Sequence, residues 1–232
     1  MQTGLTIVKD FERPSDELVQ RFKGVPVANL DDVMNRISSV NEHLTPINKT
    51  PLLGTAFTVK VPAGDNLMFH VAMDLAKPGD VIVIDAGGDT HRATFGELMV
   101  TYCRMRGIKG IVVDGSVRDV DAMEKLEDFA IYARGVTPDG PYKNGPGEVN
   151  TVVNCGGQVV HPGDIVLGDA DGVLFVRPSE AEDLLKKVQV IEDNEKRILE
   201  TMEREGTYIR DWVQPKLDTW GVQYIDYVDY TK

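Results

Sequence analysis

The sequence predicts an α/β protein built on a parallel β-sheet, and three observations support this fold class. Two short apolar runs, 80–85 and 109–114, have the length of buried strands. The segment between them opens at Thr94 with the S/T-x-x-E form of a capping box and stops at Gly107, so we expect a helix there. A strand, a helix and a second strand in this order form one parallel βαβ crossover.

Capping and turn residues locate the other elements of the first half of the chain. Asp65 or Asn66 is expected to cap a helix that ends before Pro78-Gly79. The expected elements are helices at 15–22, 29–36, 65–76 and 120–126, strands at 54–61 and 129–133, a Gly-rich loop at 86–89 and a long Gly- and Pro-rich loop at 135–148.

The second half of the chain differs from the first in its pattern of apolar and turn residues. Short apolar runs separated by turns predict a β-rich region over 150–176 that packs on the first half. The run from Asp169 to Gly172 lacks the rest of a calcium-binding loop, so we interpret it as one of these turns. A long helix is then expected from Ser179 to about Glu205.

A tail rich in aromatic residues follows that helix. Its six aromatic side chains are expected to lie on the same domain or on a neighbouring subunit; they are Tyr208, Trp212, Trp220, Tyr224, Tyr227 and Tyr230. We expect one domain over 1–232, with a core at about 20–205 and a C-terminal extension at 206–232.

Composition excludes several classes of function. The 232 residues are 42% hydrophobic and 27% charged, which is typical of a globular protein. The formal net charge of −12 argues against binding to nucleic acid or to an anionic membrane surface. The sequence shows no apolar run of about 18 residues and no signal-peptide pattern, so a cytoplasmic protein is expected. Cys103 and Cys155 match no metal spacing and are interpreted as reduced thiols.

The spacing between Glu97 and the pair Arg118-Asp119 predicts a functional site. A helix of about 13 residues and a strand of about 6 residues each span ~20 Å, so the chain returns to its starting level. Glu97 in the first helical turn should then meet Arg118 and Asp119 at the carboxyl edge of the sheet, where open α/β sheets bind ligands.

The residue types at this edge suit a divalent cation and a small anion. Asp119 is the best direct metal ligand, and Glu97 would hold the metal directly or through a bound water. Arg118 would fix a carboxylate or carbonyl oxygen and stabilise negative charge. Each residue also has a structural interpretation: a surface ion pair for Arg118, an N-cap for Asp119 and the capping box for Glu97.

The helix start offers a second anion-binding feature. Backbone N–H groups over 95–99 have no helical partner and suit a carboxylate. Gly96 has no side chain to block such an approach, although it could equally be a packing glycine.

Glu195 interrupts an apolar seam on the C-terminal helix. The seam residues recur at spacings of four and three; they are Leu184, Val188, Ile191, Ile198 and Met202. Glu195 either delivers a carboxylate to a metal site, across a subunit boundary, or faces water.

Histidine-based metal chemistry is not expected. His70 in the helix at 65–76 is interpreted as a core or hydrogen-bonding residue. His43, His91 and His161 have no partners at metal-ligand spacing, which argues against a zinc site.

The sequence resembles the RraA-like family, which includes the class II 4-hydroxy-4-methyl-2-oxoglutarate / 4-carboxy-4-hydroxy-2-oxoadipate aldolases. The resemblance covers about residues 20–205. The motifs that carry it are Gly54-Thr-Ala-Phe-Thr-Val59, Gly64-Asp-Asn66, Pro78-Gly-Asp-Val-Ile-Val-Ile-Asp85, Gly96-Glu-Leu98, Gly110-Ile-Val-Val-Asp-Gly-Ser-Val-Arg-Asp119, Pro162-Gly-Asp-Ile-Val-Leu-Gly-Asp169 and Asp171-Gly-Val173. An acidic residue followed after twenty residues by Arg-Asp marks the aldolase branch, here Glu97, Arg118 and Asp119.

The resemblance implies an α/β fold of the swivelling-domain type and a role for each matching residue. Asp119 corresponds to the magnesium ligand, Glu97 to the residue that holds a metal-bound water, and Arg118 to the residue that binds the pyruvyl oxygen. The backbone from Gly96 through Leu98 to Met99 corresponds to the cradle for the pyruvate carboxylate.

The resemblance also implies an oligomer, a homotrimer or a hexamer made of two trimers. In such an assembly a glutamate enters the site from the adjacent subunit. Glu195 is the match in this chain and Glu192 is the fallback.

These residues together predict a Mg²⁺- or Mn²⁺-dependent lyase. Such an enzyme would cleave a 4-hydroxy-4-methyl-2-oxoglutarate-type aldol, or decarboxylate oxaloacetate, through a pyruvate enolate. Some family members instead bind ribonuclease E without enzymatic activity, and this alternative stays open. A methyltransferase has no support, because the chain has no Gly-rich nucleotide loop.

Overall fold

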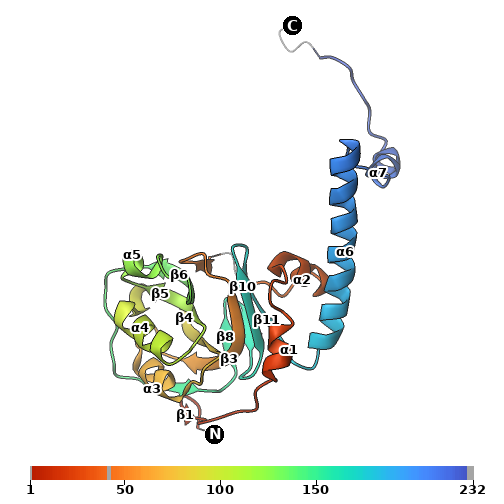
Figure 1. Ribbon diagram of the computed structural model, residues 1–232. Coiled ribbons are helices and arrows are strands. Elements are labelled where there is room, and N and C mark those ends of the chain that lie inside the picture. The colour runs from red at the N-terminus through yellow and green to blue at the C-terminus, as the bar shows by residue number, and fades with distance from the viewer. Residues whose placement is uncertain (1, 41–42, 229–232) are drawn as a thin grey trace. The chain divides into compact units, whose positions relative to one another are not determined.

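The structure, a computed structural model, describes residues 2–40 and 43–228 (Figure 1). Its strands are β1 (Leu5–Ile7), β2 (Thr45–Pro46), β3 (Leu52–Lys60), β4 (Asp80–Phe95), β5 (Gly110–Val117), β6 (Ala130–Val136), β7 (Gly147–Val149), β8 (Val153–Cys155), β9 (Gln158–Val160), β10 (Ile165–Asp169) and β11 (Gly172–Val176). Its helices are α1 (Asp16–Gln20), α2 (Val27–Val33), α3 (Leu67–Leu75), α4 (Glu97–Met105), α5 (Val120–Met123), α6 (Ala181–Glu205) and α7 (Val213–Trp220).

Four parallel strands form the centre of the main sheet, which confirms the α/β fold class. Within the described residues this sheet has nine strands in the order β1-β7-β3-β4-β5-β6-β2, and β10 joins it by pairing with β3 and β11. Strands β3, β4, β5 and β6 are mutually parallel. Helix α4 connects β4 to β5, as the βαβ prediction requires, and it lies with α3 on the left of the sheet in Figure 1.

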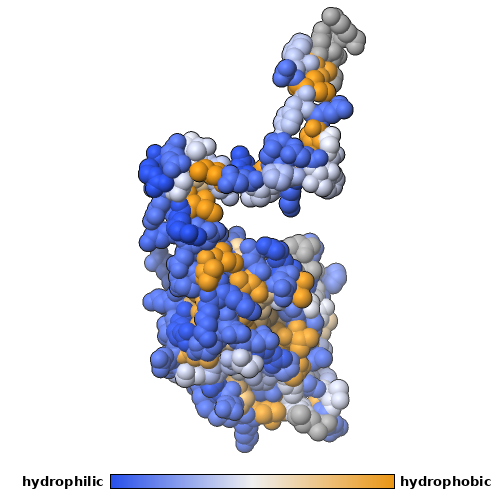
Figure 2. Space-filling view, turned by 90° about the vertical axis from the view of Figure 1, so that its right-hand side faces the viewer, coloured by the Kyte–Doolittle hydropathy of each residue, from blue (hydrophilic) through white to orange (hydrophobic). Residues whose placement is uncertain are grey.

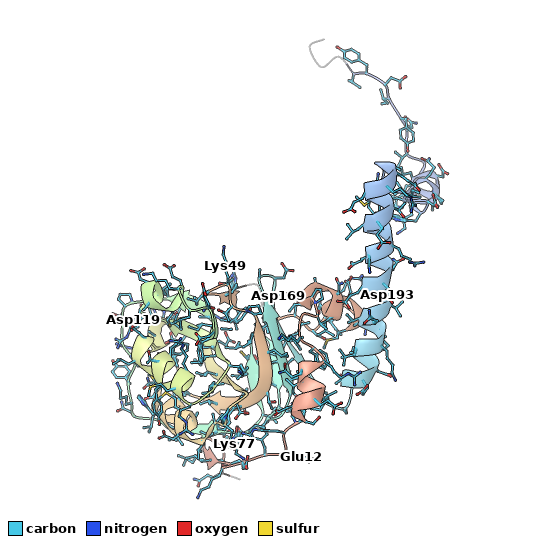
Figure 3. All side chains as sticks on the ribbon, in the orientation of Figure 1. Glu12, Lys49, Lys77, Asp119, Asp169 and Asp193 are labelled. Atoms are coloured by element: carbon cyan, nitrogen blue, oxygen red, sulfur yellow. The ribbon has the colours of Figure 1, made fainter. Side chains whose placement is uncertain are left out.

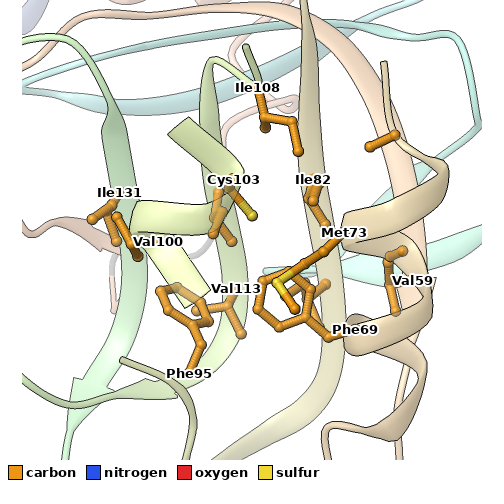
Figure 4. Close-up of a cluster of buried hydrophobic side chains, with 14 of the residues drawn as sticks. Val59, Phe69, Met73, Ile82, Phe95, Val100, Cys103, Ile108, Val113 and Ile131 are labelled. Atoms are coloured by element: carbon orange, nitrogen blue, oxygen red, sulfur yellow. The ribbon is translucent and has the colours of Figure 1, made fainter. Parts of the chain in front are cut away.

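A core of apolar side chains lies between this sheet and helices α3 and α4 (Figure 4). Phe69 of α3 and Phe95 at the end of β4 pack edge to face, with ring centroids 5.5 Å apart. Each is almost fully buried, and burying such a side chain stabilises the fold by about 1.5–3 kcal/mol. The core therefore fixes the end of β4 and the start of α4, where the candidate site lies.

The β-rich region over 150–176 packs on the first half of the chain, as predicted, because apolar side chains of β8 and β9 share a buried cluster with those of β4 and β5. Strand β10 pairs antiparallel with β3, with Ile165 opposite Thr55, so this part of the chain extends the main sheet. Only β8 and β9 form a sheet of their own among the described strands. The turn predicted at Asp169 to Gly172 is confirmed, because it joins β10 to β11.

The prediction of a Gly-rich loop at 86–89 is wrong. Strand β4 continues through this segment to Phe95, with irregular register against β5 after Asp85. Gly87 and Gly88 adopt φ of 66° and 72°, values that glycine reaches without steric cost, and this lets the strand bend and continue pairing.

Other boundaries differ from the prediction because of local backbone geometry. Helix α2 stops at Val33, before the predicted Arg36, since Asn35 and Arg36 both adopt positive φ. The loop predicted over 135–148 is shortened by β6 and β7, and the short strands β1 and β2 were not predicted.

The chain divides into two compact units, residues 1–188 and 189–232, with the boundary inside α6. In the second unit α7 and the tail expose many large apolar side chains, including Trp212 and Trp220, and Figure 2 shows apolar patches there. Tyr230 lies outside the described residues, so the role expected for the tail stays a prediction. Within the described residues, no helix has the length and apolarity needed to cross a membrane.

Candidate active site

A pocket of about 290 Å³ lies where β4 and β5 end and α4 begins. Figure 3 labels Asp119 in this region, beside α4. The pocket joins four segments that are separate in sequence: the start of α3, the β4–α4 junction, the β5–α5 junction and the loop at 139–145. Its lining residues are Asn66, His70, Phe95, Gly96, Leu98, Met99, Arg118, Asp119, Pro141 and Lys143.

Asp119 contacts the first turn of α4, as the lengths of helix and strand predict. Its Oδ2 accepts a hydrogen bond from the backbone N–H of Glu97, at 3.0 Å. The predicted capping box is wrong, because Thr94 is buried inside β4 and the N-cap is Gly96. A carboxylate from the neighbouring β5–α5 junction therefore caps α4 from across the site.

Gly96 permits this contact through its lack of a side chain. A Cβ at residue 96 would lie 2.1 Å from Asp119 Oδ2, closer than real atoms approach, and 3.0 Å from Arg118 Cγ, which is a tight contact. The backbone at Gly96 is extended, with φ of −148°, so the glycine is required by close approach and not by conformation.

The backbone aims the Asp119 side chain at α4. Asp119 adopts φ of 62°, in the left-handed region where aspartate is one of the few tolerated residues. It occupies the N-cap position of α5, yet its carboxylate makes no hydrogen bond to that helix. The structural interpretation of Asp119 as the cap of α5 thus fails, and the carboxylate serves the pocket instead.

Arg118 keeps its guanidinium available to a ligand. Its Nε lies 3.8 Å from Asp119 Oδ2, and both side chains are about half exposed, so the ion pair between them is weak. The loop at 139–145 approaches the same group, since a Cβ at Gly140 would lie 3.1 Å from Arg118 Nη1. A cation beside a carboxylate in a pocket suits an anionic oxygen ligand.

Most of the predicted N–H groups at the helix start are already used. Glu97 donates to Asp119, and the N–H of Met99 donates to the carbonyl of Gly96, at 3.2 Å. The N–H of Leu98 makes no hydrogen bond within the described chain, and Leu98 lines the pocket. The N–H groups of Gly96 and Leu98 are thus the donors at the positive end of the helix dipole that have no hydrogen-bond partner within the described chain, and they are the remaining backbone sites for a carboxylate.

The side chains of the glutamates predicted for the site do not line the pocket. Glu97 contributes its backbone to the Asp119 contact, while its side chain is exposed and is not among the pocket-lining residues. Glu195 is exposed and Glu192 half-buried, and both lie on α6 in the second unit, whereas every lining residue belongs to the first. Their roles stay predictions.

Part of the pocket wall was not predicted as functional: Asn66, His70 and Lys143. Asn66 donates from Nδ2 to the Thr94 carbonyl, at 2.8 Å, while its buried Oδ1 has no partner within the described residues. His70 Nε2 is also buried without a partner there. Burial, followed by the nearby charge of Lys143, lowers the pKa of His70, so its ring is neutral at pH 7. The i, i+4 spacing of Asn66 and His70 was the available signal.

Asp65 holds the loop at 139–145 over the pocket. Its buried carboxylate accepts hydrogen bonds from the backbone N–H groups of Leu67 at 2.8 Å, Asn144 at 2.6 Å and Gly145 at 3.1 Å. These bonds tie the start of α3 to the loop that carries Lys143.

The donor set at the pocket fits magnesium or manganese held by few protein ligands. Within the described residues, no group of three or more His, Cys, Asp or Glu side chains could hold a metal. Magnesium, however, keeps several waters and is often bound by one or two carboxylates plus substrate oxygens. Oδ1 of Asp119 makes no hydrogen bond in the described structure and is placed to take that role.

Comparison with known proteins places these residues in a family. Residues 27–175 match the family model RraA-like, described as Aldolase/RraA. A protein of Halalkalibacterium halodurans named "Putative 4-hydroxy-4-methyl-2-oxoglutarate aldolase" is 38% identical over 174 residues, which are 75% of this chain and 82% of that protein.

Solved structures show the same relationship. RraAS2 of Streptomyces coelicolor, described as an unusual member of the RNase ES inhibitor RraA protein family, aligns with a TM-score of 0.70 and 27% identity, over 79% of this chain and 97% of that chain. The RNA-processing inhibitor RraA from Thermus thermophilis aligns with a TM-score of 0.59 and 25% identity, over 65% of this chain and 92% of that chain.

Proposed function

This chain belongs to the RraA-like (Aldolase/RraA) family, and from that premise we propose that it is a divalent-metal-dependent lyase that cleaves a C–C bond of a 2-oxo acid to release pyruvate. The observation that carries the proposal is the pocket that joins the Asp119 carboxylate, the Arg118 guanidinium and the start of α4. The aldolase named among the relatives supports the reaction class.

Three groups of the chain would bind and orient the substrate. The Leu98 N–H, at the positive end of α4, would hold the carboxylate of the 2-oxo acid. Arg118 would bind the keto oxygen and stabilise the negative charge that develops on it as the enolate forms. Asp119 would hold Mg²⁺ or Mn²⁺, which when bound polarises the 2-oxo group as a Lewis acid.

Aldol cleavage also needs a base for the substrate hydroxyl. The base takes the hydroxyl proton, the electrons of the broken C–C bond form the enolate, and a proton then converts the enolate to pyruvate. We propose that a carboxylate acts here, either Glu97 beside the pocket or Glu195 of a neighbouring subunit in a homotrimer or hexamer. Oxaloacetate decarboxylation gives the same enolate without this base, so both activities are expected.

A coupled lactate dehydrogenase assay tests the proposal. We expect pyruvate release from 4-hydroxy-4-methyl-2-oxoglutarate and from oxaloacetate, abolished by EDTA and restored by Mg²⁺. Arg118→Ala should lose at least about 100-fold in kcat/KM, the size of effect seen when an oxyanion donor is removed. Arg118 is half exposed, so the variant should keep the wild-type urea midpoint. Turnover that survives EDTA, or none at all, would contradict the proposal.

The second candidate is a regulator that binds a ribonuclease. It is favoured by the two aligned structures named for inhibition of RNA processing. In that case the purified chain should bind ribonuclease E and reduce RNA cleavage, and Arg118→Ala should leave inhibition unchanged. Inhibition by a chain that lacks lyase activity would select this candidate.

A further inference from the structure

Asn66 carries a buried, unpartnered acceptor in the wall of the candidate active site. The side chain is only 1% exposed and lines the pocket. Its orientation is fixed, because Nδ2 donates to the Thr94 carbonyl and lies 3.5 Å from the Met99 sulfur. The amide must therefore turn Oδ1 away from Thr94, and this atom has no hydrogen-bond partner within the described residues.

A buried acceptor without a donor is unfavourable, so its retention in a pocket calls for an explanation. The amide oxygen can only accept a hydrogen bond. Carboxylate and keto oxygens of a 2-oxo acid are also acceptors, so they cannot be its partners. A hydroxyl group can.

The two substrates of the proposed function differ in whether they carry a hydroxyl group. An aldol substrate carries a hydroxyl on carbon 4, the group that loses its proton when the C–C bond breaks. Oxaloacetate in its keto form carries no hydroxyl. A group that pairs with Oδ1 is thus present in one reaction and absent from the other.

We propose that Asn66 is a specificity-determining residue that accepts a hydrogen bond from the substrate hydroxyl and so favours 4-hydroxy-2-oxo acids over oxaloacetate. The inference rests on the proposed function. The hydrogen bond orients the C4–OH group before its proton leaves, and it gives the buried Oδ1 atom of Asn66 a partner. A site built to pair with a hydroxyl discriminates against the analogue that lacks it.

The test is the ratio of two activities of one protein. We expect Asn66→Ala to lower kcat/KM for 4-hydroxy-4-methyl-2-oxoglutarate cleavage about tenfold more than kcat/KM for oxaloacetate decarboxylation, the effect of one lost hydrogen bond. Both activities come from the same folded molecules, so partial unfolding leaves the ratio unchanged. Tyr102→Phe removes a hydrogen bond from α4 to Asp74 at a residue that does not line the pocket, so it should keep the wild-type ratio.

A second variant checks that the effect comes from the lost acceptor and not from a cavity. Asn66→Leu has a similar volume and no acceptor, so its ratio should fall as in Asn66→Ala. A ratio that is unchanged in either Asn66 variant overturns the inference while the lyase function stands. A wild-type protein that acts on neither substrate overturns both.

Discussion

Replacing Gly96 with alanine should disable the site through a clash with the Asp119 carboxylate. The new Cβ would lie 2.1 Å from Asp119 Oδ2, whereas ordinary van der Waals contact begins at 3.4 Å. The carboxylate must therefore withdraw by about 1.3 Å, which breaks its hydrogen bond to Glu97 and moves the proposed metal ligand. The backbone itself is not strained, because φ of −148° suits alanine.

The expected loss can be worked from this displacement. A misplacement of about 1 Å in a reacting group can reduce rate about 100-fold, which corresponds to about 2.7 kcal/mol of activation free energy. The free energy of unfolding should fall by less than about 2 kcal/mol, since only one half-exposed hydrogen bond is lost. Activity should thus fall far more than stability.

The assay pairs pyruvate release with urea unfolding. Gly135→Ala is the matched control, because its Cβ would also be crowded, 2.9 Å from Ser116 Oγ, but at a residue that does not line the pocket. It should keep activity within about threefold of wild type, a margin of less than 1 kcal/mol. If Gly96→Ala were folded and as active as this control, the position of Asp119 would not matter for the chemistry.

Two further predictions concern buried titratable groups. Burial raises the pKa of Cys103 to about 12 and also raises the pKa of Cys155 well above its usual value. Neither thiol should therefore react with a thiol reagent at pH 8 until urea unfolds the chain, and rapid labelling of the native protein would contradict the burial described. Lys143→Ala should raise the pKa of His70, measured by NMR, because a nearby cation is removed, yet keep it below 6.5, because burial is the larger cause. An unchanged His70 pKa would place Lys143 away from that wall.

The meeting of Asp119 with α4 was predictable because it depends on element lengths alone. A strand and a helix that return the chain to one level bring residues 97 and 119 together whatever the details of packing. The same reasoning gave the parallel centre of the sheet, because short apolar runs separated by a helix leave few alternatives.

The features that the sequence did not predict depend on contacts between distant segments. The capping signal at Thr94 is local, and it failed because pairing of β4 with β5 extends the strand to Phe95. The wall that holds Asn66 exists because Asp65 binds the backbone of a loop about eighty residues later in the chain. No local pattern in the sequence encodes such a contact.

Binding of Mn²⁺ followed by electron paramagnetic resonance tests the central claim most directly. The central claim is that a cation at Asp119 and a 2-oxo acid at Arg118 share one pocket. Wild-type protein should bind Mn²⁺, and oxalate, a mimic of the pyruvate enolate, should alter the spectrum of the bound ion. Asp119→Asn should lose the ion, whereas Arg118→Ala should keep the ion and lose the response to oxalate. An Asp119→Asn protein that binds Mn²⁺ and responds to oxalate like the wild type would contradict the account.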